Sequence, residues 1–500
     1  MTWHAARFLI IQAILLAVAA TLAFGAWLVL HRGHAVARRW KVHISIRIAL
    51  GIVISIASLF WFTTILRGVL TDGRVVAADQ RLHNTLRLFQ SERLHLFYSA
   101  ISDLASTAFV IPVAILLAGL FWMHRRRHEA GLFLLAVAGA MSLGVVLKYI
   151  VRRPRPPDAL AFISGPSFPS GHALAATAVY GMLIFLLLRE KPRAWWHIAA
   201  VVPLFSLIVL VPISRVYLGV HWPHDVIASV DLGCAWLACL TMLVRFRLDG
   251  TRRDPVKQRV REWPFAITAA AIVAYAIVLA RFDIQREARP LLPPPRAVAG
   301  AFLATLPDGL KRTSEDLIGG PMEPLSFLFI GTAADLERVF ESAGWVRADL
   351  PSVHGLAKEL LCVIADRPDP NGPATPSYYS AQPQDLTFER PGTPSGSIRH
   401  RHHIRIWREP VCLGAACVPM WGATCSYDMG IEFVPKPYLV THRIDPQIDH
   451  EREFVDQTLL HAGATDLGII TITGPRRGKN AGGDAFITDG RAHVVRLAIY

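Results

Sequence analysis

The chain has 500 residues, of which 53% are hydrophobic and 18% are charged, and its mean hydropathy is +0.37. This composition is too apolar for a soluble protein of this size and indicates a membrane protein. The net charge of +14 is unevenly distributed, since residues 1–282 carry 30 Lys/Arg against 12 Asp/Glu. The basic residues in this half flank apolar segments, as in a membrane protein, and this placement argues against nucleic-acid binding.

Eight apolar runs are each about as long as the 17–25 residues that a helix needs to cross a bilayer. They predict an all-α polytopic membrane helix bundle of about eight spans. The runs lie at residues 8–30, 44–66, 104–123, 131–150, 172–188, 196–213, 225–244 and 264–282. We interpret the first run as an anchor and not a cleavable signal peptide, because it is as long as a spanning helix and precedes a basic loop.

The long loop between the second and third runs, residues 67–103, carries apolar residues at helical spacing. They are Leu82, Leu86, Phe89, Leu94 and Phe97. The spacing predicts an amphipathic helix, and it leaves open whether this helix lies on the membrane surface or packs on the bundle.

Basic residues gather in alternate loops, at 31–43, 124–130, 189–195 and 245–263. The positive-inside rule makes these loops cytoplasmic. The opposite, outer face then receives the N-terminus, the loops 67–103, 151–171 and 214–224, and everything after residue 282.

A Pro-rich linker at 287–296 leads into a soluble C-terminal domain. Its patterns predict an α+β fold, with helices at 333–344, 354–364 and 450–461 and strands near 399–407, 430–434, 437–443, 467–473 and 493–499. The stretch 366–398, rich in Pro, Ser and Gly, predicts a long loop. The chain thus divides into an anchor helix and basic loop (1–43), a helix bundle (44–244), a basic loop with the last span and linker (245–299), and the C-terminal domain (300–500).

The six cysteines fall into two groups. Cys234 and Cys239 lie in an apolar segment and are interpreted as packing residues. The spacing of the other four matches no zinc pattern, and one or two disulfides are expected if this half is periplasmic. They are Cys362, Cys412, Cys417 and Cys425.

Three short motifs lie at the ends of apolar runs. In the first, six residues separate Lys148 from Arg155-Pro156. The second is Pro169-Ser170-Gly171-His172. In the third, five residues separate Ser214-Arg215 from His221, and three more separate His221 from Asp225.

These residue types suit phosphoryl transfer. Lys148, Arg155 and Arg215 are cations that can offset phosphate charge, with headgroup contact or snorkelling as the alternative interpretation of each alone. Ser170 and Gly171 open a helix whose free amides and dipole favour an anion.

The third motif pairs a histidine with a carboxylate. Asp225 can hold one imidazole N–H of His221 and leave the other nitrogen free to attack phosphorus. His172 would protonate the leaving alkoxide and later activate water. His224 is a neighbouring candidate for either role, without a partner at the same offset.

This set resembles the three-part signature of the type 2 phosphatidic acid phosphatase and vanadium haloperoxidase superfamily, at every fixed position. The resemblance covers about residues 44–244 and implies an α-helical bundle, a phosphohistidine intermediate, and no required metal or other cofactor. Carried over by position, it makes His221 the nucleophile, Asp225 its orienter and His172 the general acid. Phosphate binding falls to Lys148, Arg155, Ser170, Gly171 and Arg215.

The C-terminal half resembles, more weakly, the LssY-type domain found fused to such phosphatases. The resemblance rests on the strand from Arg401 to Trp407 and on the segment from Thr441 to Arg452. It implies no chemistry that can be transferred. Several side chains there suit a metal or polar site, although a salt-bridged structural network is the favoured interpretation, because alternate strand positions point to opposite faces. They are His400, His402, His403, His442, Asp445 and Asp449.

The function expected from these features is dephosphorylation of a lipid phosphate or diphosphate, such as phosphatidic acid or an isoprenoid phosphate, at the outer face of a bilayer. By analogy with bacterial relatives this is the periplasmic side of the inner membrane. The alternatives are a phosphotransferase using the same intermediate, a vanadate-dependent haloperoxidase, disfavoured because those are typically soluble, and a non-catalytic membrane scaffold with the C-terminal domain as a binding module.

Overall fold

The protein is described by a computed structural model that divides into two compact units. The helical unit comprises Met1–Asp79 and Gln90–Pro290, and the C-terminal unit comprises Gln80–Phe89 and Leu291–Tyr500. The structure describes residues 41–159, 165–189, 195–248, 296–298, 310–349, 374–392, 400–432, 441–480 and 482–497, with a few single residues between them.

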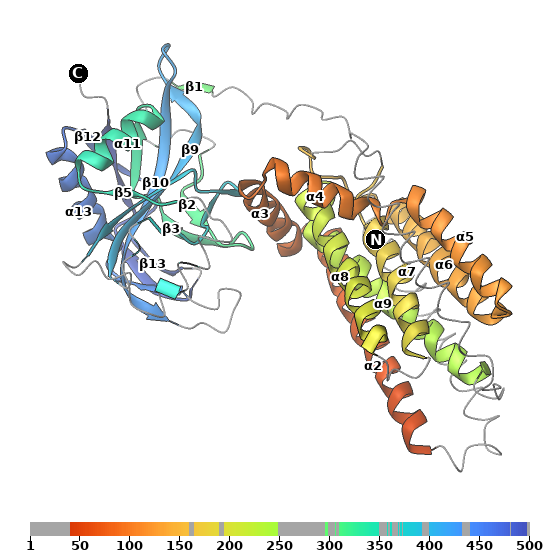
Figure 1. The fold of residues 1–500 in the computed structure, drawn as a ribbon. Helices are drawn as coiled ribbons and strands as arrows, with labels where there is room; N and C mark the ends of the chain where they lie inside the picture. Colours follow the sequence, from red (N-terminus) through yellow and green to blue (C-terminus); the bar gives the residue numbers. More distant parts are fainter. Residues whose placement is uncertain are drawn as a thin grey trace, which may run out of the picture. The chain divides into compact units, whose positions relative to one another are not determined.

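The described part of the helical unit is built from α-helices alone (Figure 1). They are α2 (Lys41–Leu70), α3 (Arg74–Leu88, shared with the C-terminal unit), α4 (Glu92–Asp103), α5 (Thr107–Met123), α6 (Arg127–Val151), α7 (Gly171–Leu188), α8 (Trp195–Tyr217) and α9 (Pro223–Leu248).

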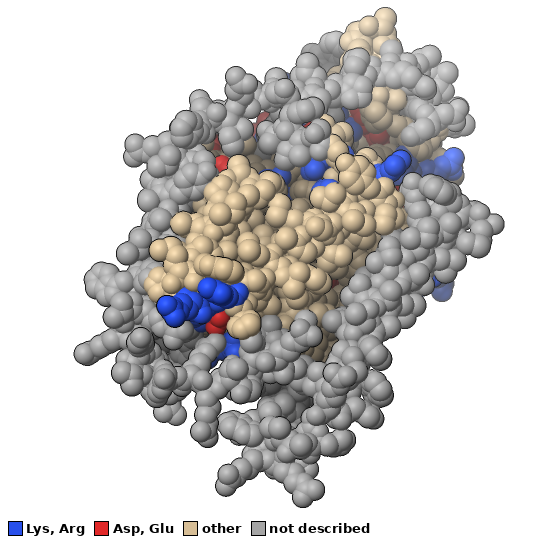
Figure 2. All heavy atoms as spheres, turned by 90° about the vertical axis from the view of Figure 1, so that its right-hand side faces the viewer, with Lys and Arg blue, Asp and Glu red and all other residues tan. Residues whose placement is uncertain are grey.

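Five of these helices are long and apolar enough to cross a membrane, and a sixth span arises if α4 and α5, bent by 41°, count as one. They match the six predicted runs between residues 44 and 244. The predicted first and eighth spans lie outside the described residues, so the count of eight stays a prediction. Figure 2 shows a broad uncharged area on the helical unit, with Lys and Arg gathered above and below it.

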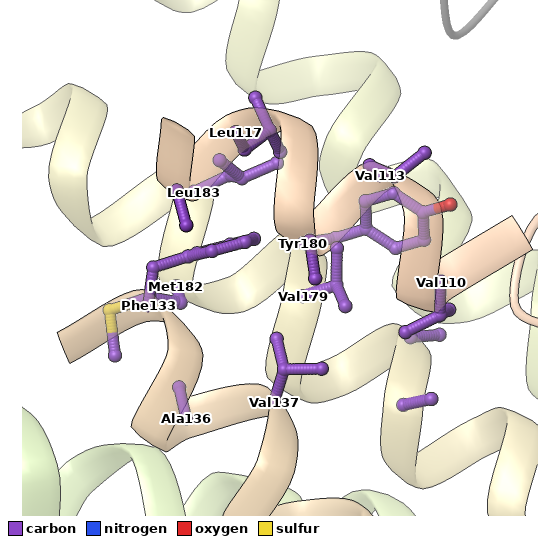
Figure 3. Packing of buried hydrophobic residues seen from close by; sticks show 14 of the residues in the cluster. Val110, Val113, Leu117, Phe133, Ala136, Val137, Val179, Tyr180, Met182 and Leu183 are labelled. Carbon is purple, nitrogen blue, oxygen red and sulfur yellow. The ribbon is translucent and has the colours of Figure 1, made fainter. Parts of the chain in front are cut away.

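The core of the bundle lies where α5, α6 and α7 meet (Figure 3). Small residues such as Ala136 allow close helix approach, and Trp236 of α9 donates its indole N–H to the Ala136 carbonyl over 3.0 Å. A Cβ at Gly139 would lie 2.3 Å from the Trp236 ring, so this contact requires glycine there.

The loop 67–103 forms two helices, α3 and α4, where one was predicted. Tyr98 of α4 packs on Tyr217 at the end of α8, with ring centroids 4.5 Å apart, and Tyr217 Oη accepts the Ser91 backbone N–H. This part of the loop therefore packs on the bundle.

The C-terminal unit is built on a nine-stranded mixed sheet with the order β12-β15-β4-β10-β9-β8-β5, in which β1 pairs with β9 and β11 with β10 (Figure 1). The strands are β1 (Arg296–Val298), β4 (Phe327–Ile330), β5 (Val346–Arg347), β8 (Leu386–Pro391), β9 (Arg401–Leu413), β10 (Val418–Glu432), β11 (Thr441–Ile444), β12 (Thr465–Thr471) and β15 (Arg491–Arg496). Smaller sheets contain β2 (Thr313–Glu315), β3 (Pro321–Pro324), β6 (Tyr378–Tyr379) and β7 (Gln382–Pro383), and β13 (Arg476–Lys479) and β14 (Ala485–Thr488).

Two cores cover the two faces of the large sheet. Helices α11 (Ala333–Ser342) and α13 (Ile448–His461) pack on one face, against Ile404 and Ile406 of β9. Trp407 of β9 points to the other face, where it packs with Tyr379. Both faces of β9 are therefore covered.

Two predicted helices, 333–344 and 450–461, are confirmed as α11 and α13. The predicted long loop at 366–398 is wrong, because β6, β7 and β8 lie inside it. The predicted strand near 430–434 is the end of β10, which begins twelve residues earlier at Val418. Most of the predicted helix 354–364 lies outside the described residues.

Cys412 and Cys417 form a disulfide that joins the end of β9 to the start of β10. Cys425 is buried and has a free thiol. Cys239 and Cys234, which were predicted to serve in packing, also have free thiols, and Cys239 is buried while Cys234 is half-buried.

Glu409 of β9 is a buried carboxyl group, 2% exposed, that faces the Tyr379 hydroxyl. Burial raises its pKa to about 7. Since the folded form then binds more protons than the unfolded chain between pH 4.5 and 7, stability falls as the pH rises through this window.

We expect Glu409→Gln to remove this pH dependence. The difference between the pKa of Glu409 in the folded protein and its ordinary value corresponds to roughly 3 kcal/mol of unfolding free energy. The parent protein should lose this stability between pH 5 and pH 8. Pulse proteolysis of the full chain across a urea series at both pH values measures it. An equal loss in parent and variant would show that another group is responsible.

Candidate active site

The three motifs converge in the helical unit. Lys148 lies in the last turn of α6, and its Nζ donates to the Pro166 carbonyl in the following loop over 2.7 Å. Arg155, in the same loop, donates from Nη1 to the Val220 carbonyl just after α8 over 2.6 Å, and from Nε to the Gly165 carbonyl over 3.0 Å. The first motif is thereby tied to the third.

The second motif begins α7. Ser170 is fully buried and is the N-cap, its Oγ accepting the Ala173 N–H, while its own N–H donates to Ser229 Oγ of α9 over 2.7 Å. A Cβ at Gly171 would meet no atom within 4 Å, so the helix N-terminus there borders open space. An anion can approach these amides closely.

His172 follows on the first turn of α7 and is half-buried. It interacts electrostatically with residues from both other motifs, namely Arg215, His221, Lys148 and Arg155. The structure therefore brings both predicted catalytic histidines and the three predicted cations together.

His221 and Asp225 are buried side by side, with His221 Nδ1 3.6 Å from Asp225 Oδ2. Arg155 Nη1 lies 3.3 Å from His221 Nε2. A guanidinium can only donate, so Nε2 must carry the lone pair and Nδ1 the ring proton. The tautomer thus places the lone pair on Nε2 and the ring proton on Nδ1, which faces Asp225 at 3.6 Å without forming a hydrogen bond.

The charge state of His221 fits this tautomer. Burial lowers its pKa to about 3, mainly by desolvation, with the neighbouring Arg215 and Arg155 acting in the same direction and Asp225 opposing them. Burial also lowers the pKa of Arg155. His221 is therefore neutral at physiological pH.

Arg215 lies in the last turn of α8 and is 4% exposed. Its Nη1 donates to Ser102 Oγ of α4, but Nε and Nη2 are buried without an acceptor among the described residues. Buried N–H groups without a partner cost about 1–3 kcal/mol each, so this guanidinium is set up to bind an oxyanion.

Arg153 was not predicted. Its Nη1 donates to Asp225 Oδ1 over 2.6 Å and its Nη2 to Asp79 Oδ2 over 2.7 Å, and all three side chains are buried. Arg153 is adjacent to exposed Arg152 in a basic segment, and nothing in the sequence distinguishes the two. Asp79 of α3 lies 74 residues away and has no local signal.

Asp79 also accounts for His224. Its Oδ1 accepts the His224 backbone N–H over 2.9 Å and lies 2.7 Å from His224 Nδ1. His224, which had no partner at the offset seen for His221, is therefore held by a different carboxylate.

In the C-terminal unit, the predicted polar set does form salt bridges. His402 Nδ1 lies 2.8 Å from Glu451 Oε2 on the helix-covered face, whereas His403 points to the opposite face. The group of described residues with metal-ligand geometry is a different one, Asp456, Asp466 and His493.

Comparisons with known proteins match both halves of the chain. The model for the PAP2 superfamily matches residues 129–249, and the model for the LssY C-terminus matches residues 306–492. The chain is 33% identical over 178 residues to phosphatidylglycerophosphatase B of Bacillus subtilis, covering 35% of this chain and 88% of that protein.

Two further relatives are similar over a smaller part. An undecaprenyl-diphosphatase of Sulfolobus acidocaldarius is 35% identical over 142 residues, which is 27% of this chain and 62% of that protein. A solved structure of a transmembrane PAP2-type phosphatidylglycerolphosphate phosphatase from Bacillus subtilis is 28% identical, with a TM-score of 0.36, covering 40% of this chain and 98% of that one.

Proposed function

Because the chain belongs to the PAP2 superfamily and carries an LssY C-terminal domain, we propose that it hydrolyses lipid phosphate monoesters or diphosphates through a phosphohistidine intermediate. It is an integral membrane protein whose relatives are PAP2-type phosphatases. The observation that carries the proposal is His221, neutral and buried, with Nε2 unprotonated beside Arg155 and with Nδ1 toward Asp225.

In the proposed first step, His221 Nε2 attacks phosphorus and the bond from phosphorus to the lipid oxygen breaks. Protonated His172 gives its proton to the leaving alkoxide. Asp225 stabilises the charge that develops on the His221 ring.

In the second step, His172 takes a proton from water as the water oxygen attacks the phosphohistidine. The phosphorus–nitrogen bond breaks, and inorganic phosphate leaves. Together the two steps return His221 and His172 to their starting states.

Five residues are proposed to hold the phosphate: Lys148, Arg155, Ser170, Gly171 and Arg215. Two N–H groups of Arg215 lack an acceptor among the residues that the structure describes, and this and the open α7 N-terminus at Gly171 support the role. Their charge would stabilise the transferring group as negative charge builds up in the transition state.

A lipid substrate is favoured by the site's position. Four site residues lie in the first or last turns of helices long enough to span a bilayer, namely Lys148, His172, Arg215 and Asp225. The phosphate would therefore lie at headgroup depth. The names of the relatives, a phosphatidylglycerophosphatase and an undecaprenyl-diphosphatase, favour the same substrate class.

We also propose that the site and the C-terminal domain face the periplasm, with domain limits near residues 44–244 and 300–500. The charge of the loops supports this orientation. The Cys412–Cys417 disulfide supports it independently, since disulfides persist in oxidising compartments.

The proposal is tested with the purified full chain in detergent–lipid micelles. Phosphate release is measured from phosphatidic acid, phosphatidylglycerol phosphate, undecaprenyl diphosphate and, as a soluble control, glucose 6-phosphate. We expect release from at least one lipid and much less from the soluble ester. If no lipid phosphate is hydrolysed, the proposal is wrong.

A further inference from the structure

Three adjacent strands of the C-terminal unit carry a buried polar cluster on one face of the sheet. In the register, His403 of β9 pairs with Ser426 of β10 and Glu389 of β8, while Arg401 pairs with Asp428. Since alternate residues of a strand share a face, these side chains lie together. This is the face opposite α11 and α13.

The cluster lines a cavity of about 70 Å³. Three of its lining residues are in contact in a particular order. Ser426 Oγ lies 2.7 Å from His403 Nε2, and His403 Nδ1 lies 3.2 Å from Asp428 Oδ1. All three side chains are at least nine-tenths buried, with residue exposures of 4%, 3% and 1%.

The tautomer of His403 follows from Arg405. Arg405 Nη1 lies 2.9 Å from His403 Nε2, and a guanidinium group can only donate hydrogen bonds. Nε2 must therefore carry the lone pair, so the Ser426 hydroxyl donates to it and the ring proton on Nδ1 faces Asp428. Burial lowers the pKa of His403, which keeps the ring neutral and able to accept a proton.

The carboxylate of Asp428 is itself held in place. Arg401 Nε donates to Asp428 Oδ2 over 3.1 Å, and Arg401 Nη1 donates to Glu389 Oε2 over 2.7 Å. The contacts run in the order of a nucleophile, its base and the group that orients the base, with His403 Nδ1 and Asp428 Oδ1 3.2 Å apart but not aligned as a hydrogen bond.

The charges around the cavity indicate the kind of substrate. Its lining includes three carboxylates and two guanidinium groups, which belong to Glu323, Glu389, Asp428, Arg401 and Arg405. With His403 neutral, this balance disfavours an anion such as free phosphate. A neutral group of a few heavy atoms fits both the charge and the volume.

We propose that this cavity is a second active site, in which Ser426, His403 and Asp428 hydrolyse small neutral carboxylic esters. Ser426 Oγ bonds to the ester carbonyl carbon, and its proton passes to His403 Nε2. The carbonyl electron pair moves onto the carbonyl oxygen. Arg405 is the proposed hydrogen-bond donor to this oxygen, since its buried Nε has no partner among the described residues.

The intermediate then collapses. The bond from carbon to the leaving oxygen breaks, and that oxygen takes the proton from His403 Nε2. Water attacks the acyl-serine, losing its proton to His403, and the bond to Ser426 Oγ breaks as Oγ regains that proton. The products are an alcohol and a carboxylic acid, and no co-reactant beyond water is consumed.

The test uses the full-length protein with p-nitrophenyl acetate as substrate and a fluorophosphonate as covalent probe. We expect a fluorophosphonate adduct on the peptide containing Ser426, and ester hydrolysis that falls by about 10³-fold or more in Ser426→Ala and in His403→Ala. Ser342→Ala, an exposed serine in α11, is the matched control and should keep parental activity.

Two outcomes overturn the proposal. One is the absence of any adduct on Ser426 in protein whose folding has been verified by circular dichroism and by retention of the disulfide. The other is parental ester hydrolysis in Ser426→Ala. Lipid phosphate release tests the phosphatase proposal and ester hydrolysis with the Ser426 adduct tests this one, so failure of the two proposals gives different results.

Discussion

Replacing His221 with alanine is expected to lower phosphate release from the preferred lipid substrate by about 10⁴-fold or more. Without Nε2 there is no atom to accept the phosphoryl group, and Asp225 and Arg155 lose the ring that they orient. Acid-labile labelling of the protein by a substrate carrying radioactive phosphate should disappear together with turnover.

The matched control is His128→Ala, which changes an exposed histidine in the first turns of α6 and should keep parental activity. Gel filtration and thermal unfolding establish that both variants are folded. Parental turnover in His221→Ala, or acid-labile labelling that survives the substitution, would mean that another residue is the nucleophile.

Replacing Arg153 with alanine is expected to destabilise the helical unit by about 3–5 kcal/mol. The substitution leaves Asp79 and Asp225 buried without the guanidinium that both now bind. Because Asp225 also faces His221, phosphate release should fall as well. Thermal unfolding in detergent and turnover at a temperature where the variant is folded measure the two effects separately.

Two further variants make this prediction specific. Arg152→Ala removes the neighbouring exposed arginine, whose Nε donates to the Tyr149 carbonyl, and should change stability by no more than about 0.5 kcal/mol. Asp79→Asn in the Arg153→Ala background removes one uncompensated charge and should recover part of the loss. If Arg153→Ala unfolds at the parental temperature, the buried ion pairs do not anchor the site.

Sequence patterns found the described spans because a spanning helix must be continuously apolar over its whole length. The same reasoning failed in the C-terminal unit for β4 and β10. Phe327–Ile330 is buried throughout, and β10 is packed on both faces, so neither strand has the alternation that identifies a half-exposed strand. In β8, the two buried apolar positions, Leu386 and Phe388, lie in a Pro- and Gly-rich stretch that does not indicate a strand.

The candidate site divides in the same way. Lys148, Arg155, His172, Arg215 and His221 were found because each belongs to a short motif, and the structure brings them together as expected. Which nitrogen of His221 is protonated was not predictable, because it depends on Arg155, which lies 66 residues away.

By itself the sequence determined the membrane helices, the three motifs and the amphipathic helices of the C-terminal half, because each depends on residues within one or two turns of chain or one continuous apolar run. Only the tertiary structure decided which carboxylates pair with Arg153, which N–H groups of Arg215 find no acceptor in the described part of the chain, and that His403 lies between Ser426 and Asp428. These facts depend on contacts between distant segments, and a hydrogen bond across them leaves no periodic trace in the chain. The pairing of buried charges is settled by packing, which brings together groups that the sequence keeps apart.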